Sequence, residues 1–189
     1  MTSMRNVVLA CCLALSLPAL AQGTPAPAAP APGPTFQADA AGVLGHVQEQ
    51  MVSLAKAMPQ NKLTWRPAKG VRSVGEVYAH AAGSAYWYGK QLGFEVPEGV
   101  QAKMKDLEKS TDKAQFEKAL TDSFTWFAGQ VKAMPDSELT KTVSLMGHDL
   151  TKRAMIMLTM GHYQEHLGQS IAYARMNGVV PPWSKSDKS

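Results

Sequence analysis

Two histidines, His162 and His166, are the residues of this chain best placed to do chemistry. They lie four residues apart in the stretch 161–169, whose sequence is GHYQEHLGQ. In a helix this spacing puts both imidazoles on nearly the same face, one turn apart. Met155, Leu158 and Tyr173 continue that face, so we expect both rings to point inward. Buried polar groups need partners, and a metal ion is one partner that both rings could share.

A third histidine, His80, is expected on the inward side of another helix, in line with Val77, Ser84 and Tyr88. A His-x-x-x-His pair with one distant histidine is the ligand pattern of an open metal site. The structural alternative is a set of core histidines that hydrogen bond to the backbone or to water. On the pattern alone both interpretations stay open.

Other polar residues are weaker candidates. Gln169 and Glu76 each lie about one turn from a histidine and could orient its ring, although Glu76 better fits a capping role. His46 is expected at the surface of the first helix, and His148 in a loop near the mouth of the site. Glu165 is turned about 100° from His166 around the helix, so we do not expect it to be a ligand or a base. The aromatic residues large enough to line a pocket, although more commonly plain core, are Trp87, Tyr88 and Tyr163.

Several enzyme motifs are excluded. Residues 162–166 also match the H-x-x-E-H pattern of inverted zinc peptidases, which need a carboxylate ligand well downstream, and only 23 residues follow His166. A carboxylate-bridged di-iron site needs Glu-x-x-His pairs, and no glutamate here has a histidine three residues on. The two cysteines, Cys11 and Cys12, both lie in a segment that we expect to be removed, so we expect no thiol nucleophile and no thiolate metal ligand in the mature chain.

That segment resembles an export signal. Arg5 precedes the apolar run 7–17, and Ala19-Leu20-Ala21 is an A-x-A cleavage site. We therefore expect a signal peptide over 1–21, cut near Ala21, and a periplasmic or secreted protein without stable membrane insertion after cleavage. A disordered Pro/Ala-rich spacer (22–35) and a flexible tail (183–189) flank the domain. The net charge of +4 is spread without a basic patch, so no nucleic-acid partner is expected.

Four helices must position the histidines. Apolar residues at helical spacing predict helices over about 36–58, 73–92, 112–134 and 151–176, with Pro59 and Pro135 ending two of them. The connection 93–110 has a helical turn near 100–107, and the connection 137–149 has extended character at 139–145. We expect an all-α four-helix bundle over 36–182, in which the long 93–110 connection joins two parallel neighbours.

The chain resembles the DinB/YfiT-like superfamily. The motifs concerned are Trp65-Arg66-Pro67, the stretch SVGEVYAH at 73–80, His162-x-x-x-His166-x-Gly168-Gln169 and Arg175-x-x-Gly178. The resemblance covers 36–182. It implies an up-down-down-up bundle with a divalent metal site whose ligands here would be His80, His162 and His166. Members include metal-dependent hydrolases and thiol-S-transferases, and the family name does not imply DNA binding.

One departure from the family concerns location. The thiol-transferases of this type act on cytosolic thiols, whereas this chain carries an export signal. The expected function is therefore an exported metal-dependent enzyme, a hydrolase or transferase, that uses Zn²⁺ or Ni²⁺ on an unidentified small-molecule substrate. The alternative is a non-catalytic metal- or ligand-binding bundle, and pairing as a homodimer stays open. A shared ion requires the three histidine nitrogens to lie about 3–4 Å apart.

Overall fold

The computed structural model describes residues 33–184. The predicted signal peptide and nearly all of the predicted spacer lie outside the described residues. In chain order the elements are α1 (Phe36–Ala57), η1 (Gln60–Lys62), α2 (Val74–Gln91), α3 (Val100–Leu107), α4 (Lys113–Ala133), α5 (Asp136–Leu139), β1 (Thr142–Leu145), β2 (His148–Thr151), α6 (Lys152–Met176) and η2 (Pro182–Ser184). The short helix η2 packs against α1 and crosses the expected domain boundary at 182.

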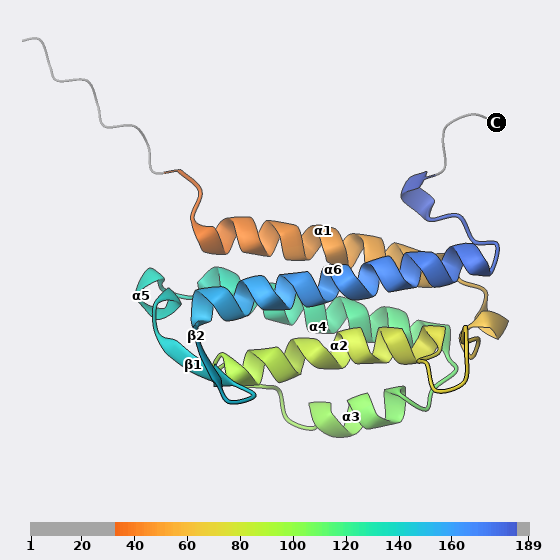
Figure 1. Ribbon diagram of the computed structural model, residues 1–189, viewed down its shortest axis with the longest axis horizontal. Helices are drawn as coiled ribbons and strands as arrows, with labels where there is room; N and C mark the ends of the chain where they lie inside the picture. The colour runs from red at the N-terminus through yellow and green to blue at the C-terminus, as the bar shows by residue number, and fades with distance from the viewer. Residues whose placement is uncertain (1–32, 185–189) are drawn as a thin grey trace, which may run out of the picture. The chain divides into compact units, whose positions relative to one another are not determined.

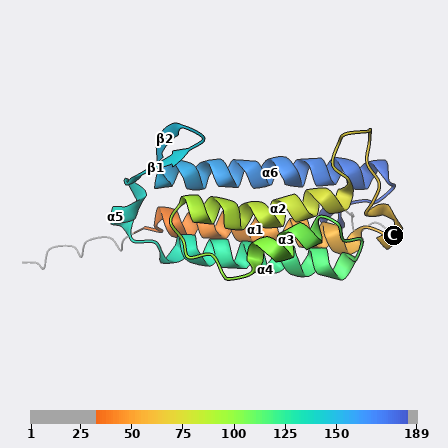
Figure 2. The same cartoon turned by 90° about the horizontal axis from the view of Figure 1, so that it is seen from below.

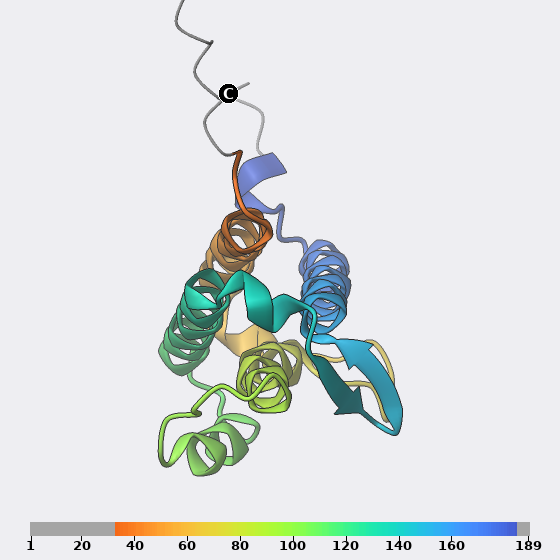
Figure 3. The same ribbon diagram turned by 90° about the vertical axis from the view of Figure 1, so that its left-hand side faces the viewer.

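The long helices α1, α2, α4 and α6 form a four-helix bundle. Both α1 and α2 pack against α4 and α6, so α1 and α2 occupy opposite corners, as Figure 3 shows end-on. In Figure 1, α1 and α6 run in one direction and α2 and α4 in the other, which is the expected up-down-down-up order. The connection from α2 to α4 returns along the bundle and carries α3 beside α2.

Local capping explains where the helices begin. At the start of α2 the Ser73 side chain accepts a hydrogen bond from the Glu76 backbone N–H (3.2 Å), and the Glu76 carboxylate accepts one from the Ser73 N–H (2.7 Å). Such a reciprocal capping box satisfies two backbone donors that the helix leaves free. Thr151 caps α6 in a similar way through its hydroxyl. The two caps thus set where the helices that carry the histidines begin.

The core lies between the four long helices. Its largest fully buried side chains include Tyr78, Tyr163, Phe116, Phe124 and Phe127, together with Leu44, Met51, Leu54 and Leu120. Burial of each such side chain contributes about 1.5–3 kcal/mol. Tyr163 stacks on Phe124 with ring centroids 4.4 Å apart, so it belongs to the core and does not line a pocket.

The connection before α6, for which the sequence predicted extended character at 139–145, adds a small sheet to the helical bundle. Its extended residues pair as an antiparallel hairpin of β1 and β2, with Val143 opposite Leu150. Met146 and Gly147 form the turn and both have positive φ, 52° and 85°. Two positive φ values give the turn a twist that matches that of paired strands. None of the helices among residues 33–184 is long and apolar enough to cross a membrane.

Candidate metal centre

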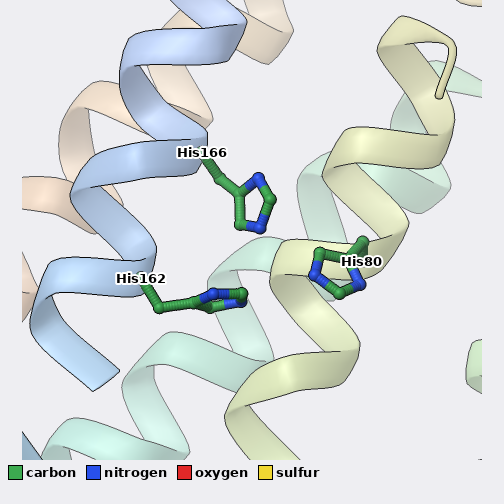
Figure 4. A group of neighbouring side chains, drawn as sticks. All are labelled: His80, His162 and His166. Carbon is green, nitrogen blue, oxygen red and sulfur yellow. The ribbon is translucent and has the colours of Figure 1, made fainter. Parts of the chain in front are cut away.

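The three predicted histidines come together between α2 and α6. His80 projects from α2 toward His162 and His166 on α6, as Figure 4 shows, and one nitrogen from each ring lies within 4.8 Å of the others. The ring centroids are 4.4 Å apart for His162–His166, 4.7 Å for His80–His166 and 5.3 Å for His80–His162. This grouping is looser than the expected 3–4 Å. Tetrahedral bonds of ~2.1 Å would place the nitrogens ~3.4 Å apart, so small ring rotations would close the site around an ion.

The histidines lie at the edge of the core. On α2, Val77 and Ala81 are fully buried while His80 between them is half-buried. On α6, His166 is 6% exposed and His162 is half-buried. Leu158, which we expected to point inward, is 43% exposed. Four residues cover about 400°, so Leu158 is turned about 40° from His162, here toward solvent.

A hydrogen-bonded chain orients His166. Its Nδ1 lies 3.0 Å from Oε1 of Gln169, whose Nε2 donates to the Tyr173 hydroxyl at 3.1 Å. Because an amide oxygen can only accept, Nδ1 of His166 is the donor in this hydrogen bond, and in the neutral ring the lone pair is then on Nε2. Gln169 therefore holds the ring in the tautomer that a metal site needs, which agrees with its predicted orienting role.

The other two rings are poor bases in this environment. Burial, helped by the positive charge of Arg72, lowers the pKa of His80 to about 4. Burial and the neighbouring His166 lower the pKa of His162 to about 4. Both rings are thus neutral near pH 7, the form in which imidazole binds metals. The Nε2 atom of His162 is buried and has no hydrogen-bond partner, so the donor set fits a nitrogen-preferring divalent ion.

Aromatic residues of α2 and α6 flank the three histidines on both sides. The ring of Tyr88 lies 5.3 Å from that of His162, and Trp87 lies 4.8 Å from Tyr88. Toward the other end, Trp65 contacts Tyr173 edge-on at 5.4 Å. The loop that carries Trp65 and the β1–β2 hairpin project from the same side of the bundle at opposite ends, as Figure 2 shows. The two segments thus lie near opposite ends of α6, the helix that carries His162 and His166.

The other polar residues considered in the sequence lie outside the histidine cluster. Glu76 completes the capping box and pairs with Arg66 at 2.8 Å, so its carboxylate is engaged away from the rings. His46 is exposed on α1, as expected. His148 is exposed too, but it belongs to strand β2 and not to a loop, because the hairpin extends over it.

Sequence reasoning missed Arg72. Its positive charge acts on both His80 and His162, although it lies in the loop before α2. An arginine in a polar loop carries no spacing signal, so only the folded chain reveals this proximity. The loop also holds Trp65 against α6, a contact between segments far apart in the sequence.

Topology and site together define the class of up-down-down-up helical bundles with a histidine cluster between two helices. Within this class, the chain belongs to the DinB family, whose model matches residues 44–188. This match confirms the resemblance found in the sequence. No curated protein matches the chain significantly.

Solved structures of the same fold come from several bacteria. A DinB-like protein from Bacillus cereus ATCC 10987 has a TM-score of 0.64 at 19% identity, covering 75% of this chain and 94% of its own. A conserved protein from Enterococcus faecalis has a TM-score of 0.65 at 12% identity, with coverages of 76% and 98%. YfiT from Bacillus subtilis, described as a probable metal-dependent hydrolase with an unusual four-helix bundle topology, has a TM-score of 0.60 at 15% identity, with coverages of 80% and 94%. At these identities the likeness shows the fold.

Proposed function

We propose that this protein is a metal-dependent enzyme, a hydrolase or transferase, in which His80, His162 and His166 bind a divalent ion, Zn²⁺ or Ni²⁺. One observation carries the proposal: three imidazole nitrogens from two helices lie within 4.8 Å of one another. The partnerless, buried Nε2 of His162 supports it, because such an atom is costly unless something binds it. The description of YfiT as a probable metal-dependent hydrolase favours hydrolysis.

The residues in and around the histidine cluster would have different roles. Three neutral imidazoles leave the positive charge of an ion intact, and a bound ion supplies Lewis-acid chemistry. Gln169 orients His166. Tyr88 and Trp87 provide an apolar wall on one side, and Arg72 adds positive charge near the rings, which favours substrates with a negative or strongly polar group.

Metal content tests the ligand assignment. The mature protein should be stripped with a chelator, reloaded with Zn²⁺ or Ni²⁺, and analysed by mass spectrometry of the elements. We expect about one ion per chain in the wild type and in His46→Ala, which removes an exposed histidine from α1. His80→Ala should lose the ion. Equal metal content in all three proteins would rule out the site.

Turnover separates an enzyme from a binding module. Among the described residues no carboxylate joins the three-histidine cluster, so a dedicated general base is missing from its immediate surroundings. This observation favours the alternative, a bundle that binds a metal or ligand without catalysis. Metal-dependent cleavage of any ester, amide or thiol conjugate in a broad panel would establish the enzyme. A fully loaded protein that turns over none of them would establish the alternative.

We also propose export, supported by Arg5, the apolar run 7–17 and the A-x-A site that ends at Ala21. Expression in a bacterium with an intact secretion system should yield a mature protein that begins at Gln22. Intact mass measurement of the periplasmic and cytoplasmic fractions checks this. A full-length chain confined to the cytoplasm would contradict it.

A further inference from the structure

A cavity lies between α2 and α3, and none of the three histidines lines it. Its volume is about 920 Å³. Small-molecule sites typically have volumes of ~300–1,000 Å³. Helix α3 stands outside the four-helix bundle, beside α2, as Figure 3 shows. The crossover connection, which the topology requires only as a link, thus creates a space large enough for a ligand.

The walls of this cavity are mostly aromatic and aliphatic. Tyr86 and Trp87 come from α2, Phe94 from the connection and Met104 from α3. Trp126 of α4 supports two of them from behind, with ring centroids 4.9 Å from Tyr86 and 6.1 Å from Phe94. The aromatic wall is therefore held in place by the bundle before any ligand arrives.

The charge of the lining has one sign. Its only ionisable cations are Lys90 on α2 and Lys105 on α3, and it contains no acidic residue. Both lysines are exposed, and neither has an ion-pair partner within residues 33–184. A lining that combines two lysines, one from α2 and one from α3, with apolar side chains is complementary to a molecule with an apolar body and an acidic group.

We propose that this cavity binds an amphipathic organic anion, an aromatic or aliphatic acid whose acidic group meets Lys90 and Lys105. The aromatic wall contributes stacking and apolar burial, and the lysines select the anion over a neutral analogue. None of the three histidines lines this cavity, although Trp87, which does, also contacts Tyr88 beside His162.

A matched pair of dyes tests the charge. The probes are 8-anilino-1-naphthalenesulfonate and N-phenyl-1-naphthylamine, which share the ring system and differ in the sulfonate. In the metal-free mature protein, Lys90→Gln/Lys105→Gln should weaken binding of the sulfonate dye by roughly twofold to thirtyfold, since each exposed pair contributes modestly. The neutral dye should bind as before. Lys103→Gln/Lys109→Gln is the control, with the same charge change on exposed lysines outside the lining.

A larger side chain that projects into the cavity tests whether the dyes bind there. A Cβ at Gly83 would lie 3.8 Å from Met104 Cγ, so Gly83→Leu projects into the cavity without a clash at its first atom. Leucine also favours the helix over glycine. Both dyes should lose at least tenfold in affinity, while His162→Ala should leave both unchanged. Dye binding that survives Gly83→Leu, falls with His162→Ala, or falls equally in both lysine pairs would overturn the proposal. If Gly83→Leu does not fold, the lysine pairs decide.

Discussion

The two sides of the bundle differ in what their helices bury. Between residues 44 and 54 of α1, every buried side chain is apolar, and α1 packs closely on α4, whose Leu120 and Phe124 are also buried. Between α2 and α6, by contrast, the meeting side chains include His80, His162, His166 and Gln169. One side thus supplies cohesion, and the other carries polar groups that add little to it.

This division explains how the fold tolerates a partnerless buried nitrogen. Core burial contributes in proportion to apolar area removed from water, and all four long helices, α2 and α6 included, provide it. The histidines lie at the edge of the core, where two of the rings stay partly in contact with solvent. The contact between α2 and α6 can therefore keep the Nε2 atom of His162 without a partner while the rest of the bundle stays folded.

The largest effect should come from the apolar side. Leu54→Ala on α1 removes a fully buried side chain and leaves a cavity, so we expect a loss of about 2–5 kcal/mol in the free energy of unfolding. Chemical denaturation measures it. Val43→Ala, at a position that is 40% exposed on the same helix, should cost far less. Similar losses in the two variants would show that burial at position 54 does not determine the contribution of α1 to stability.

Between α2 and α6, by contrast, removal of a histidine should cost little stability without metal and should abolish the stabilisation by metal. In metal-free protein, His162→Ala should change the free energy of unfolding by less than about 1 kcal/mol, because the lost ring held a buried nitrogen without a partner. At a Zn²⁺ concentration of about 100 Kd the wild type should gain about 2.7 kcal/mol and His162→Ala nothing. Denaturation with and without metal measures both effects.

His148→Ala in the hairpin, which removes an exposed imidazole, should retain the full gain from metal. If Zn²⁺ stabilised His162→Ala as much as the wild type, the ion would bind elsewhere. A large loss of stability in the metal-free variant would instead assign the histidines to the core.

The sequence was sufficient where local rules decide the structure. The capping box at Ser73, the prolines after α1 and α4 and the apolar spacing placed the four long helices, and the spacing of His162 and His166 placed two rings on one face. The inward position of His80 on the second helix then made it their candidate partner, the family resemblance implied the same set, and the folded chain brings the three together.

Long-range contacts decided what the sequence did not reveal. The hairpin was missed as a hairpin because its strands have only four residues each and its turn begins with Met146, a residue rarely chosen for positive φ. The exposure of Leu158 depends on how α6 is rotated against α2, and helical spacing alone fixes that only to within a few tens of degrees. The proximity of Arg72 to the rings and the cavity beside α3 arise from loops whose paths no local pattern specifies.

Gln169 provides a finer test of the polar side. Gln169→Ala removes the acceptor for the Nδ1–H of His166 and should weaken metal binding about 10–100-fold. Competition with a chromophoric chelator measures the affinity. Gln164→Ala, at an exposed position of the same helix, is the control, and Gln169→Glu, which keeps an acceptor, should restore binding. Unchanged affinity in Gln169→Ala would show that the hydrogen bond does not position the ring.

The smallest effect should come from the end of the bundle beside the β1–β2 hairpin. Ion pairs connect α5 to α6 at this end. Glu138 of α5 pairs with Lys141 and, at 2.8 Å, with Lys152 of α6, and hydrogen bonds from these lysines lower its pKa from 4.5 to about 2. Because the pKa is depressed in the folded state, the stabilisation is present above pH 4.5 and is lost as the pH falls through about 2.

The stability gap between the wild type and Glu138→Gln should therefore be constant near neutral pH and close in acid, as urea midpoints from pH 7 to pH 2 will measure. Asp122→Asn is the matched control, because Asp122 forms a more exposed ion pair with Lys118. The side chains of Asp122 and Lys118 are 51% and 77% exposed, whereas those of Glu138 and Lys152 are 27% and 17% exposed. Solvent screens such exposed pairs, so the gap for Asp122→Asn should be smaller. A gap for Glu138→Gln that does not change with pH would mean that side-chain packing, and not charge, joins α5 to α6.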